Sequence, residues 1–460
     1  MKEYDVIVLG AGPGGYTAAL QTAKNGLRTA VIEKENLGGV CLNVGCIPSK
    51  SLLKNAEIAR TLRKDCKSFG ITCDNLNLDY AAAVERSRKV SKRLNQGVAF
   101  LLRNAGVDVF FGKGEFEDAH TIHVELNDGS EENLRAGNII IACGTKPVEI
   151  PGMLPDGERI LNYRQAILQT ILPKRVVIIG GGAIGVEFAT VWNSYGSAVT
   201  IVEMQGHLLP NEDAEAGAEL ERAFKKQGIK IKTGTALCGV DKTDEGVIVH
   251  LKQNDTESIV EADQVVIVVG FRSNAPDLGL DKAGVPMTAR GWIETDEMCR
   301  TVVPGVYAIG DIAGKVLLAH TAEAMGKMVG NLIAGKEPAP LRYDLMPHAT
   351  YSHPQVASFG YTEESAKAAC VDYKIGKAGF IANGKALGLA DNEGWVKLLC
   401  AKETNAVIGA VLVGPEVSEL LPELSLAAVH GLTAEDIALN VHAHPTLSEV
   451  LMEAAEQLLN

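Results

Sequence analysis

The sequence predicts an α/β protein in which one βαβ unit is inserted into another and an α+β segment follows. Two observations predict this class. A glycine-rich turn between a strand-like run and a helix-like run occurs twice, at residues 10–15 and 180–185, and it does not recur after residue 340. With 460 residues, the chain is long enough for roughly two to four domains.

The composition argues against several classes of partner. A net charge of −13 disfavours binding to nucleic acid or to an anionic membrane surface. No apolar run approaches the roughly 20 residues that a membrane span needs, and the first glycine turn comes too early for a signal peptide. Nine cysteines with scattered spacing indicate mostly reduced thiols in a cytoplasmic protein, where a disulfide is more often catalytic than structural.

The first glycine turn has every part of a dinucleotide-binding fingerprint. A strand-like run at residues 4–9 leads into Gly10, Gly12 and Gly15, an alanine-rich helix follows, and a second strand ends at Glu33. The acid lies 23 residues after the first glycine, which is the expected spacing. The glycines let a pyrophosphate approach the helix N-terminus, and the acid accepts hydrogen bonds from a ribose.

The second turn repeats this pattern with the same spacing. A strand at residues 175–179 precedes Gly180, Gly182 and Gly185, and a strand at residues 198–202 leads to Glu203. No arginine occurs between residues 204 and 211. Because a carboxylate repels the 2′-phosphate of NADP, this site is predicted to prefer NAD.

The order of strands predicts nested Rossmann-like domains. Buried runs end at Gly144 and Gly270, and a strand at residues 302–309 is followed by Asp311, which is suited to bind a ribose or ribityl hydroxyl. We expect residues 1–146 and 271–340 to form the first dinucleotide-binding domain and residues 147–270 the second. Residues 341–460 are predicted to form an α+β dimerisation domain with an antiparallel sheet, ending in a helix that reaches residue 460.

Two cysteines, Cys41 and Cys46, stand among glycines just before a helix-like run. In a straight helix their Cα atoms would be about 7.5 Å apart in rise alone, whereas a disulfide rarely spans more than about 7 Å. A bond between them needs an irregular backbone, which Gly45 favours. The spacing alone is a weak signal, because two buried and unrelated thiols would give the same pattern.

Two other charged segments are less specific. A His-Glu pair, His444 and Glu449, stands beside Pro445 near the end of the sequence, and His442 precedes it. Residues 79–104 predict one long amphipathic helix with a basic face, which we interpret as solvated and without a function.

Together these segments resemble the pyridine nucleotide-disulfide oxidoreductases, and within that family most closely the branch that acts on lipoamide. The resemblance covers essentially the whole chain and is carried by three segments: GVCLNVGCIPSK at residues 39–50, AIGD at residues 308–311 and HAHPTLSE at residues 442–449. The ending Ile-Pro-Ser-Lys is typical of the lipoamide branch. The resemblance implies FAD in the first site, NAD in the second, and a homodimer that shares its active site across the interface.

The resemblance also implies roles for single residues. Electrons would pass between NAD, the flavin, a Cys41–Cys46 disulfide and a dithiol substrate carried by a lipoyl protein of a 2-oxo acid dehydrogenase complex or of the glycine cleavage system. Cys46 would lie against the flavin as the charge-transfer thiolate, and Cys41 would form the mixed disulfide with the substrate. His444 from the opposite subunit would deprotonate the substrate thiol, with His442 as the less favoured rival base, and Glu449 would hold the His444 ring.

The remaining implied residues surround the cofactors. Lys50 would lie near the flavin with Glu187 as its counter-charge, Asp311 would bind the ribityl chain, and residues 317–320 would approach the isoalloxazine ring. Glu187 would also lie at the NAD site. Further cofactor contacts are expected at Lys34, Gly39, Gly114, Gly144, Ala319 and Gly270.

Some positions depart from the family pattern, and other activities remain open. Cys143 stands where many relatives have Thr, and Phe271 stands where an Arg often precedes Arg272. A glutathione or trypanothione reductase would select NADP with arginine, a mercuric reductase would have a C-terminal cysteine pair, and a soluble transhydrogenase would lack one or both of Cys41 and Cys46. A non-catalytic flavoprotein scaffold and a reductase of another small disulfide are further alternatives. No metal site is predicted.

Overall fold

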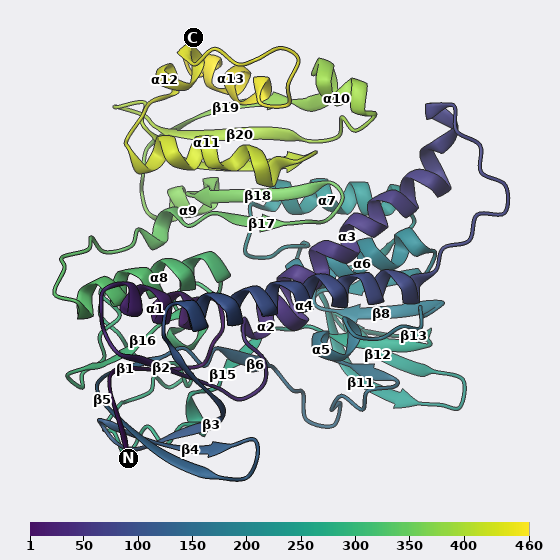
Figure 1. The fold of residues 1–460 in the computed structure, drawn as a ribbon. Helices are drawn as coiled ribbons and strands as arrows, with labels where there is room; N and C mark the ends of the chain where they lie inside the picture. Colours follow the sequence, from purple (N-terminus) through teal and green to yellow (C-terminus); the bar gives the residue numbers. More distant parts are fainter. Residues whose placement is uncertain (460) are drawn as a thin grey trace. The chain divides into compact units, whose positions relative to one another are not determined.

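The computed structural model describes residues 1–459, which divide into two compact units. The first unit comprises residues 1–51, 82–148 and 270–343, and the second comprises residues 52–81, 149–269 and those from 344 onward. Figure 1 shows the strands and helices of both. Both units are discontinuous in sequence. In the first unit, strands from segments far apart in the chain pair within the same sheet, whereas each sheet of the second unit comes from one continuous segment.

The first unit is built on a mixed sheet whose parallel strands lie in the order β3–β2–β1–β5–β16. β4 pairs antiparallel with both β3 and β5. The short strands β6 and β15 pair with each other. The strands are β1 (Lys2–Leu9), β2 (Thr29–Glu33), β3 (Asp108–Asp118), β4 (Thr121–Leu126), β5 (Glu131–Ile141), β6 (Thr145–Pro147), β15 (Phe271–Ser273) and β16 (Val306–Ala308).

Strand β16 is shorter than the predicted strand at residues 302–309. Its N-terminal side is interrupted by Gly305, whose φ of +78° is left-handed and whose added Cβ would lie 2.5 Å from the Gly137 carbonyl oxygen. The chain therefore turns at Gly305 and joins the sheet for only three residues.

Helices α1 (Pro13–Lys24) and α8 (Ala319–Ile333) lie side by side on the sheet of the first unit (Figure 1). Their close approach depends on glycine, because a Cβ on Gly326 would lie 2.5 Å from the Gly14 carbonyl oxygen. Residues 39–104 contribute one short helix, α2 (Gly39–Val44), and two long helices, α3 (Cys46–Arg60) and α4 (Tyr80–Asn104). Short turns of other helix types cover Thr61–Asp65, Cys66–Phe69, Ala275–Asp277, Gly310–Ala313, Tyr343–Leu345 and Phe380–Ala382.

The second unit contains a parallel sheet in the order β10–β9–β8–β14–β7 and a separate antiparallel sheet, β11–β12–β13. Its buried strands are rich in Val and Ile, as the sequence predicts for a parallel sheet. The elements are β7 (Ile160–Leu161), α5 (Tyr163–Ala166), β8 (Arg175–Ile179), α6 (Ala183–Tyr195), β9 (Ala198–Val202), α7 (Ala214–Lys226), β10 (Lys230–Lys232), β11 (Thr235–Lys242), β12 (Val247–Gln253), β13 (Thr256–Ala262) and β14 (Gln264–Ile267).

The same unit holds the predicted antiparallel sheet of the α+β segment, in the order β17–β18–β21–β20–β19. Helices α11 and α13 pack against it (Figure 1). The predicted final helix is too long: α13 ends at Glu456, and Asn460 lies outside the described residues. After Glu456 the backbone no longer follows the α-helical hydrogen-bond pattern, because the amide of Leu458 donates to the carbonyl of Ala455, three residues earlier. The elements are β17 (His348–Thr350), β18 (Gln355–Gly360), α9 (Glu363–Ala368), β19 (Tyr373–Gly379), α10 (Gly384–Leu389), β20 (Trp395–Ala401), β21 (Val407–Gly414), α11 (Val417–Val429), α12 (Ala434–Leu439) and α13 (Glu449–Glu456).

A buried cation, Lys397 on β20, connects three elements of the second unit. Its Nζ lies 2.9 Å from Asp213, which caps α7, and 3.0 Å from both Glu215 and Glu363, while its side chain is only 2% exposed. Burial alone would lower the pKa of Lys397, but the hydrogen bonds to these carboxylates outweigh it and raise that pKa above its usual range. The start of α7 is therefore tied to β20 by charge.

Among residues 1–459, no helix combines the length and the apolar character that crossing a membrane requires.

Candidate functional site

The first glycine turn has a backbone that only glycine allows. Gly10 has a φ of +93°, and a Cβ there would lie 2.5 Å from the Ala142 carbonyl oxygen. A Cβ on Gly15 would lie 1.9 Å from the Gly10 oxygen. At Gly12 an added Cβ meets nothing within 4 Å, and α1 has no side-chain cap. The turn therefore leaves open space beside first-turn amides, which fits a pyrophosphate.

Glu33 stands at the end of β2 and is buried, with 7% exposure. Its Oε2 accepts from the Ala11 amide and its Oε1 from the Glu35 amide, both at 2.8 Å. Burial raises the pKa of Glu33. Each carboxylate oxygen keeps a further acceptor site, so the residue fits the predicted contact with a ribose hydroxyl.

The second turn repeats this geometry. Gly180 has a φ of +112°, a Cβ on Gly185 would lie 2.0 Å from the Gly180 oxygen, and one on Gly182 would meet nothing within 4 Å. Glu203, buried at the end of β9, accepts from the Gly181 and Gln205 amides at 2.7 Å each. Both turns thus fit the pyrophosphate and ribose of a dinucleotide.

The other predicted cofactor residues lie in several settings. Asp311 is partly buried and accepts from the Thr145 hydroxyl at 3.3 Å, and burial raises its pKa. Gly144 and Gly270 both have left-handed backbones with open space around them. Gly114 lies on β3, where an added Cβ would meet the Leu9 side chain at 2.8 Å. Lys34 is exposed after β2, and Ala319 begins α8.

The cysteine segment begins against the first glycine turn. The Gly38 amide donates to the Ala11 carbonyl at 2.7 Å. Gly39 has a φ of +56°, and a Cβ there would lie 2.7 Å from the Gly12 Cα. The segment that carries both cysteines is thus fixed to the turn predicted to hold the flavin nucleotide.

The helix breaks between the two cysteines, which confirms the predicted irregular backbone. α2 ends at Val44, and α3 starts at Cys46. Gly45 lies at the break, where an added Cβ would lie 3.0 Å from the Val40 carbonyl oxygen and 3.3 Å from the Cys41 Cα. A side chain at Gly45 would crowd the end of α2, so glycine favours the fold-back that brings the two thiols together.

The two thiols interact directly. A hydrogen bond between Cys41 and Cys46, together with burial and the charge of Cys46, raises the pKa of Cys41 above its usual range, and Lys50 acts in the opposite direction. Cys41 therefore holds its proton more tightly than an isolated thiol would. Lys50 lies one turn further along α3.

His444 and Glu449 form a pair at the start of α13. His444 Nδ1 donates to Glu449 Oε1 at 2.8 Å, and Glu449 Oε2 accepts from the Thr446 amide at 2.8 Å. These two hydrogen bonds lower the pKa of Glu449. Since Nδ1 carries the proton, Nε2 is the acceptor nitrogen, and the His444 side chain is 78% exposed.

The rival base, His442, lies in a different environment. Its side chain is only 4% exposed; Nδ1 contacts the Asn440 carbonyl at 2.7 Å, and Nε2 contacts Glu423 at 3.0 Å. Asn440 also donates to Glu423 at 3.0 Å. Glu423, on α11, was missed by sequence reasoning because its partners lie far along the chain. The geometry favours His444 as the accessible base.

Glu187 lies on α6, where it is buried and accepts from the Tyr351 amide at 3.0 Å. Its pairing with Lys50 stays a prediction. At the two departures from the family pattern, Cys143 contacts the Leu9 carbonyl at 3.4 Å, with its pKa raised to about 12 by burial, and Phe271 begins β15.

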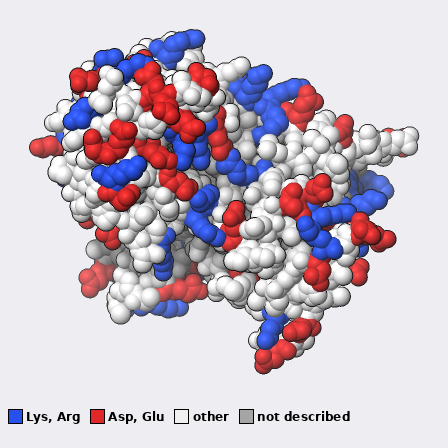
Figure 2. Space-filling view, turned by 90° about the horizontal axis from the view of Figure 1, so that it is seen from below, with Lys and Arg blue, Asp and Glu red and all other residues white. Residues whose placement is uncertain are grey.

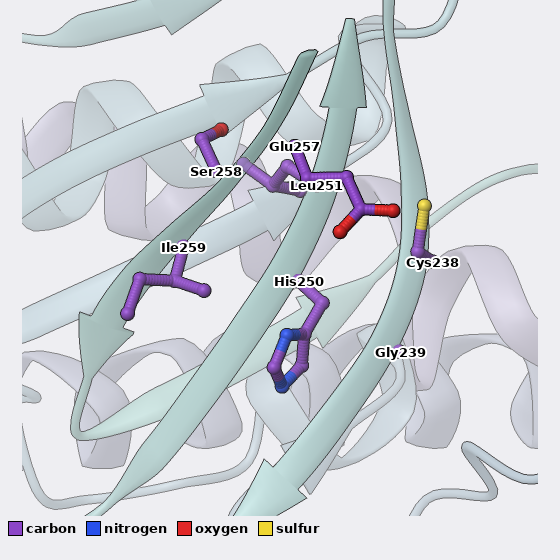
Figure 3. Close-up of a pocket in the computed structure, with 7 residues that line it drawn as sticks. All are labelled: Cys238, Gly239, His250, Leu251, Glu257, Ser258 and Ile259. Atoms are coloured by element: carbon purple, nitrogen blue, oxygen red, sulfur yellow. The ribbon is translucent and has the colours of Figure 1, made fainter. Parts of the chain in front are cut away.

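A hollow of about 570 Å³ lies on the antiparallel sheet of the second unit. Its lining residues come from three neighbouring strands: Cys238 and Gly239 on β11, His250 and Leu251 on β12, and Glu257, Ser258 and Ile259 on β13 (Figure 3). None of them is a predicted site residue.

No group of three acidic, His or Cys side chains in residues 1–459 is arranged to hold a metal ion. Figure 2 shows acidic and basic side chains interspersed on one face of the molecule, without a continuous basic surface.

Two dinucleotide turns and a thiol pair define an oxidoreductase that links a nicotinamide nucleotide to disulfide chemistry. The chain matches the family model described as pyridine nucleotide-disulphide oxidoreductase over residues 4–326, and the dimerisation domain of that family over residues 346–455. The chain belongs to this family. It therefore uses FAD and NAD, and the second match supports a homodimer.

Curated relatives are similar over their whole length. The chain is 46% identical to a dihydrolipoyl dehydrogenase of Mycobacterium leprae, with 100% of this chain and 99% of the relative covered. It is 44% identical to one of Chlorobaculum parvum (98% and 96%) and 42% identical to one of Geobacillus stearothermophilus (99% and 96%).

Solved structures share the fold. LpdA from Mycobacterium tuberculosis matches with a TM-score of 0.92 at 29% identity, and all of both chains is covered. The HOCl-induced flavoprotein disulfide reductase RclA from Escherichia coli, solved as a Cu(II) complex, matches with a TM-score of 0.89 at 25% identity over the whole of both chains.

Proposed function

We propose that this oxidoreductase reoxidises dihydrolipoamide to lipoamide and reduces NAD+, as the names of its curated relatives suggest. The observation that carries the proposal is the contact between the Cys41 and Cys46 thiols across the helix break at Gly45. A thiol pair anchored on the first dinucleotide turn suits dithiol exchange coupled to a flavin.

The thiol chemistry follows from the pKa order of the pair. One substrate thiolate attacks the Cys41 sulfur, the Cys41–Cys46 bond breaks, and Cys46 leaves as the thiolate. The second substrate thiolate then attacks the substrate sulfur joined to Cys41, which closes the lipoamide disulfide and releases Cys41. The substrate loses two electrons and the cysteine pair gains them. The raised pKa of Cys41 makes Cys41 the poorer leaving group of the two, so Cys46 is proposed to leave.

His444 is proposed as the base that takes the proton from the substrate thiol at Nε2. Glu449 fixes the Nδ1 proton and the ring orientation through the 2.8 Å hydrogen bond, and it stabilises the imidazolium that forms. We assign these roles to His444 and Glu449 of the opposite subunit, so that a monomer lacks a complete site.

FAD, when bound, supplies the two-electron link between the cysteine pair and NAD. The glycine turns and the acids Glu33 and Glu203 hold the two nucleotides. We also propose that Lys50 and Glu187 form a charge pair near the flavin, and that Asp311 contacts its ribityl chain.

The physiological substrate is proposed to be a lipoyl group carried on another protein, of a 2-oxo acid dehydrogenase complex or of the glycine cleavage system. We place the enzyme in the cytoplasm. The scattered cysteines, of which Cys299 and Cys400 are buried, suit a reducing compartment.

The test is to mix the purified protein with dihydrolipoamide and NAD+ and to follow NADH formation, with NADP+ and reduced glutathione as controls. We expect turnover that requires NAD+ and dihydrolipoamide and that falls at least about 100-fold in Cys46→Ser and His444→Ala. Flavin reduction by NADH without dithiol turnover would refute the substrate assignment and favour another disulfide.

A further inference from the structure

The basic face of α4 is not uniformly solvated, although the sequence interpretation assigned it no function. Lys89 follows that interpretation, because it is exposed and pairs with Glu85 one turn away at 2.8 Å. Arg88, its neighbour, is partly buried and points instead at the segment that carries the cysteines.

Arg88 donates from Nη1 to the carbonyl oxygen of Asn43 at 2.5 Å. Its other contacts are long hydrogen bonds to Ser87 and Ser91 on its own helix, at 3.5 and 3.4 Å. Burial lowers the pKa of Arg88, and no carboxylate in residues 1–459 offsets that cost. Desolvating part of a guanidinium without a carboxylate partner costs free energy, and the contact with the Asn43 carbonyl offsets part of that cost.

Asn43 lies between Cys41 and Cys46, in the last turn of α2. The final carbonyls of a helix lack intrahelical partners, and a cation near them is favourable. Arg88 therefore caps α2 immediately before the break at Gly45 that brings the two thiols together.

A second α4 residue holds the same segment. Asn95 donates to the Leu37 carbonyl at 2.7 Å and to the Asn43 side-chain oxygen at 3.2 Å. The Asn43 amide group in turn donates to the carbonyls of Leu37 and Gly39, both at 2.9 Å. Arg88 and Asn95 thus fix both ends of α2 from one helix face.

We propose that Arg88 is a positioning residue for the cysteine pair, which keeps the two sulfurs at bonding distance by clamping the Asn43 carbonyl. This inference rests on the proposed function, in that Cys41 and Cys46 must form the redox disulfide. Loosening the clamp lowers the effective concentration of one thiol toward the other, so the disulfide becomes easier to reduce.

The experiment equilibrates the FAD-loaded protein with mixtures of reduced and oxidised dithiothreitol, whose two thiols deliver two electrons and two protons to the disulfide. Acid quenching, alkylation and mass spectrometry then give the fraction of Cys41–Cys46 disulfide. We expect Arg88→Gln to lower the equilibrium constant for disulfide formation about tenfold, a shift of about 30 mV. Arg88→Lys, which keeps the charge and one donor, should show a smaller change.

Lys89→Gln is the matched control, since it removes a charge from the adjacent position and should leave the equilibrium constant unchanged. FAD content and the thermal unfolding midpoint report on folding. An R88Q protein that keeps its FAD and has the wild-type equilibrium constant would overturn the proposal. If R88Q loses FAD, wild-type values in both R88K and Asn95→Ala would overturn it instead. A wild-type protein that forms no Cys41–Cys46 disulfide at any ratio would refute the proposed function itself.

Discussion

The two dinucleotide turns have nearly the same backbone but are held in place by different physics. In each turn, the first glycine has a left-handed backbone, and the third glycine lies in van der Waals contact with it. A buried acid in each turn accepts hydrogen bonds from two backbone amides. The first turn is supported by close packing, because α8 touches α1 at Gly14 and Gly326. In the second unit, the chain that follows Glu203 is held by the charges around Lys397. The repeated glycine and acid motif therefore forms the same turn in both units, while the contacts that hold the neighbouring chain differ between them.

The largest expected effect is on the start of α7, which the charges around Lys397 hold. Lys397→Met removes a cation that is 2% exposed and leaves Asp213, Glu215 and Glu363 without their shared partner. Breaking such a buried cluster costs about 3–5 kcal/mol. Hydrogen–deuterium exchange should show lost protection in α7 and β20, with α1 unchanged. Lys367→Met, which removes an exposed partner of Glu363, is the control and should change nothing; equal effects of both substitutions would show that the cluster is not a support.

The support of the first turn is tested by Gly326→Ala. The new methyl group would lie 2.5 Å from the Gly14 carbonyl oxygen and 3.0 Å from the Ala18 nitrogen, so α8 must move away from α1. Overpacking of this kind costs about 1–3 kcal/mol. We expect reduced FAD content in the purified protein and unchanged protection of α7. Gly97→Ala in α4, where an added Cβ meets nothing, is the control; full FAD retention in G326A would disprove the packing argument.

The equivalence of the two acids is tested by Glu203→Gln and Glu33→Gln. Each acid accepts two amides, and an amide side chain cannot accept at both of its ends. We expect Glu203→Gln to raise the KM for NAD+ about tenfold, or about 1.4 kcal/mol, with normal FAD content. Glu33→Gln should weaken FAD binding and leave the KM for NAD+ unchanged. A change in both cofactors from one substitution would show that the acids are not independent.

The smallest effect is the response to acid, which should have opposite signs at Glu363, beside Lys397, and at Glu33, in the first turn. The hydrogen bond from Lys397 lowers the pKa of Glu363, so its stabilisation is present above the unfolded pKa of about 4.3 and is lost as the pH falls through the lower folded pKa. Burial raises the pKa of Glu33, so its penalty is relieved when it binds a proton as the pH falls.

This difference is measured by hydrogen–deuterium exchange at pH 7 and at pH 4, corrected for intrinsic rates. We expect protection to fall first in α7 and α9 and later in α1 and β2. Simultaneous loss in both units would contradict the assignment.

Local patterns in the sequence were enough to predict the turns and many strands. The strand at residues 198–202 matches β9 in both bounds, because a short run of apolar residues between a glycine and the acid has no alternative pairing. An irregular backbone at Gly45 was expected only on the condition that the two cysteines form a bond, and the structure has a break there. The final helix was predicted too long, since nothing local marks its end at Glu456.

The contacts that support the site could not be predicted in this way. Arg88 and Lys89 are adjacent and chemically alike, yet one is exposed and the other contacts Asn43, 45 residues earlier in the chain. Glu423 lies 19 residues before His442 and meets it only through the fold. Helix periodicity places a residue on a face, but the neighbour of that face is set by tertiary structure.

The hydrogen bond from the Gly38 amide to the Ala11 carbonyl fixes how far the cysteine segment lies from the first glycine turn. The Ala11 amide is bound by Glu33 and its carbonyl by Gly38, so the segment between strand β2 and the cysteines forms a short loop whose two ends bind the same residue. An inserted residue there would displace both thiols from the nucleotide turn, whereas an insertion in the loop at residues 70–79 would not. Spacing in this segment is therefore dictated by distance, and its length is as much a part of the redox centre as its sulfur atoms.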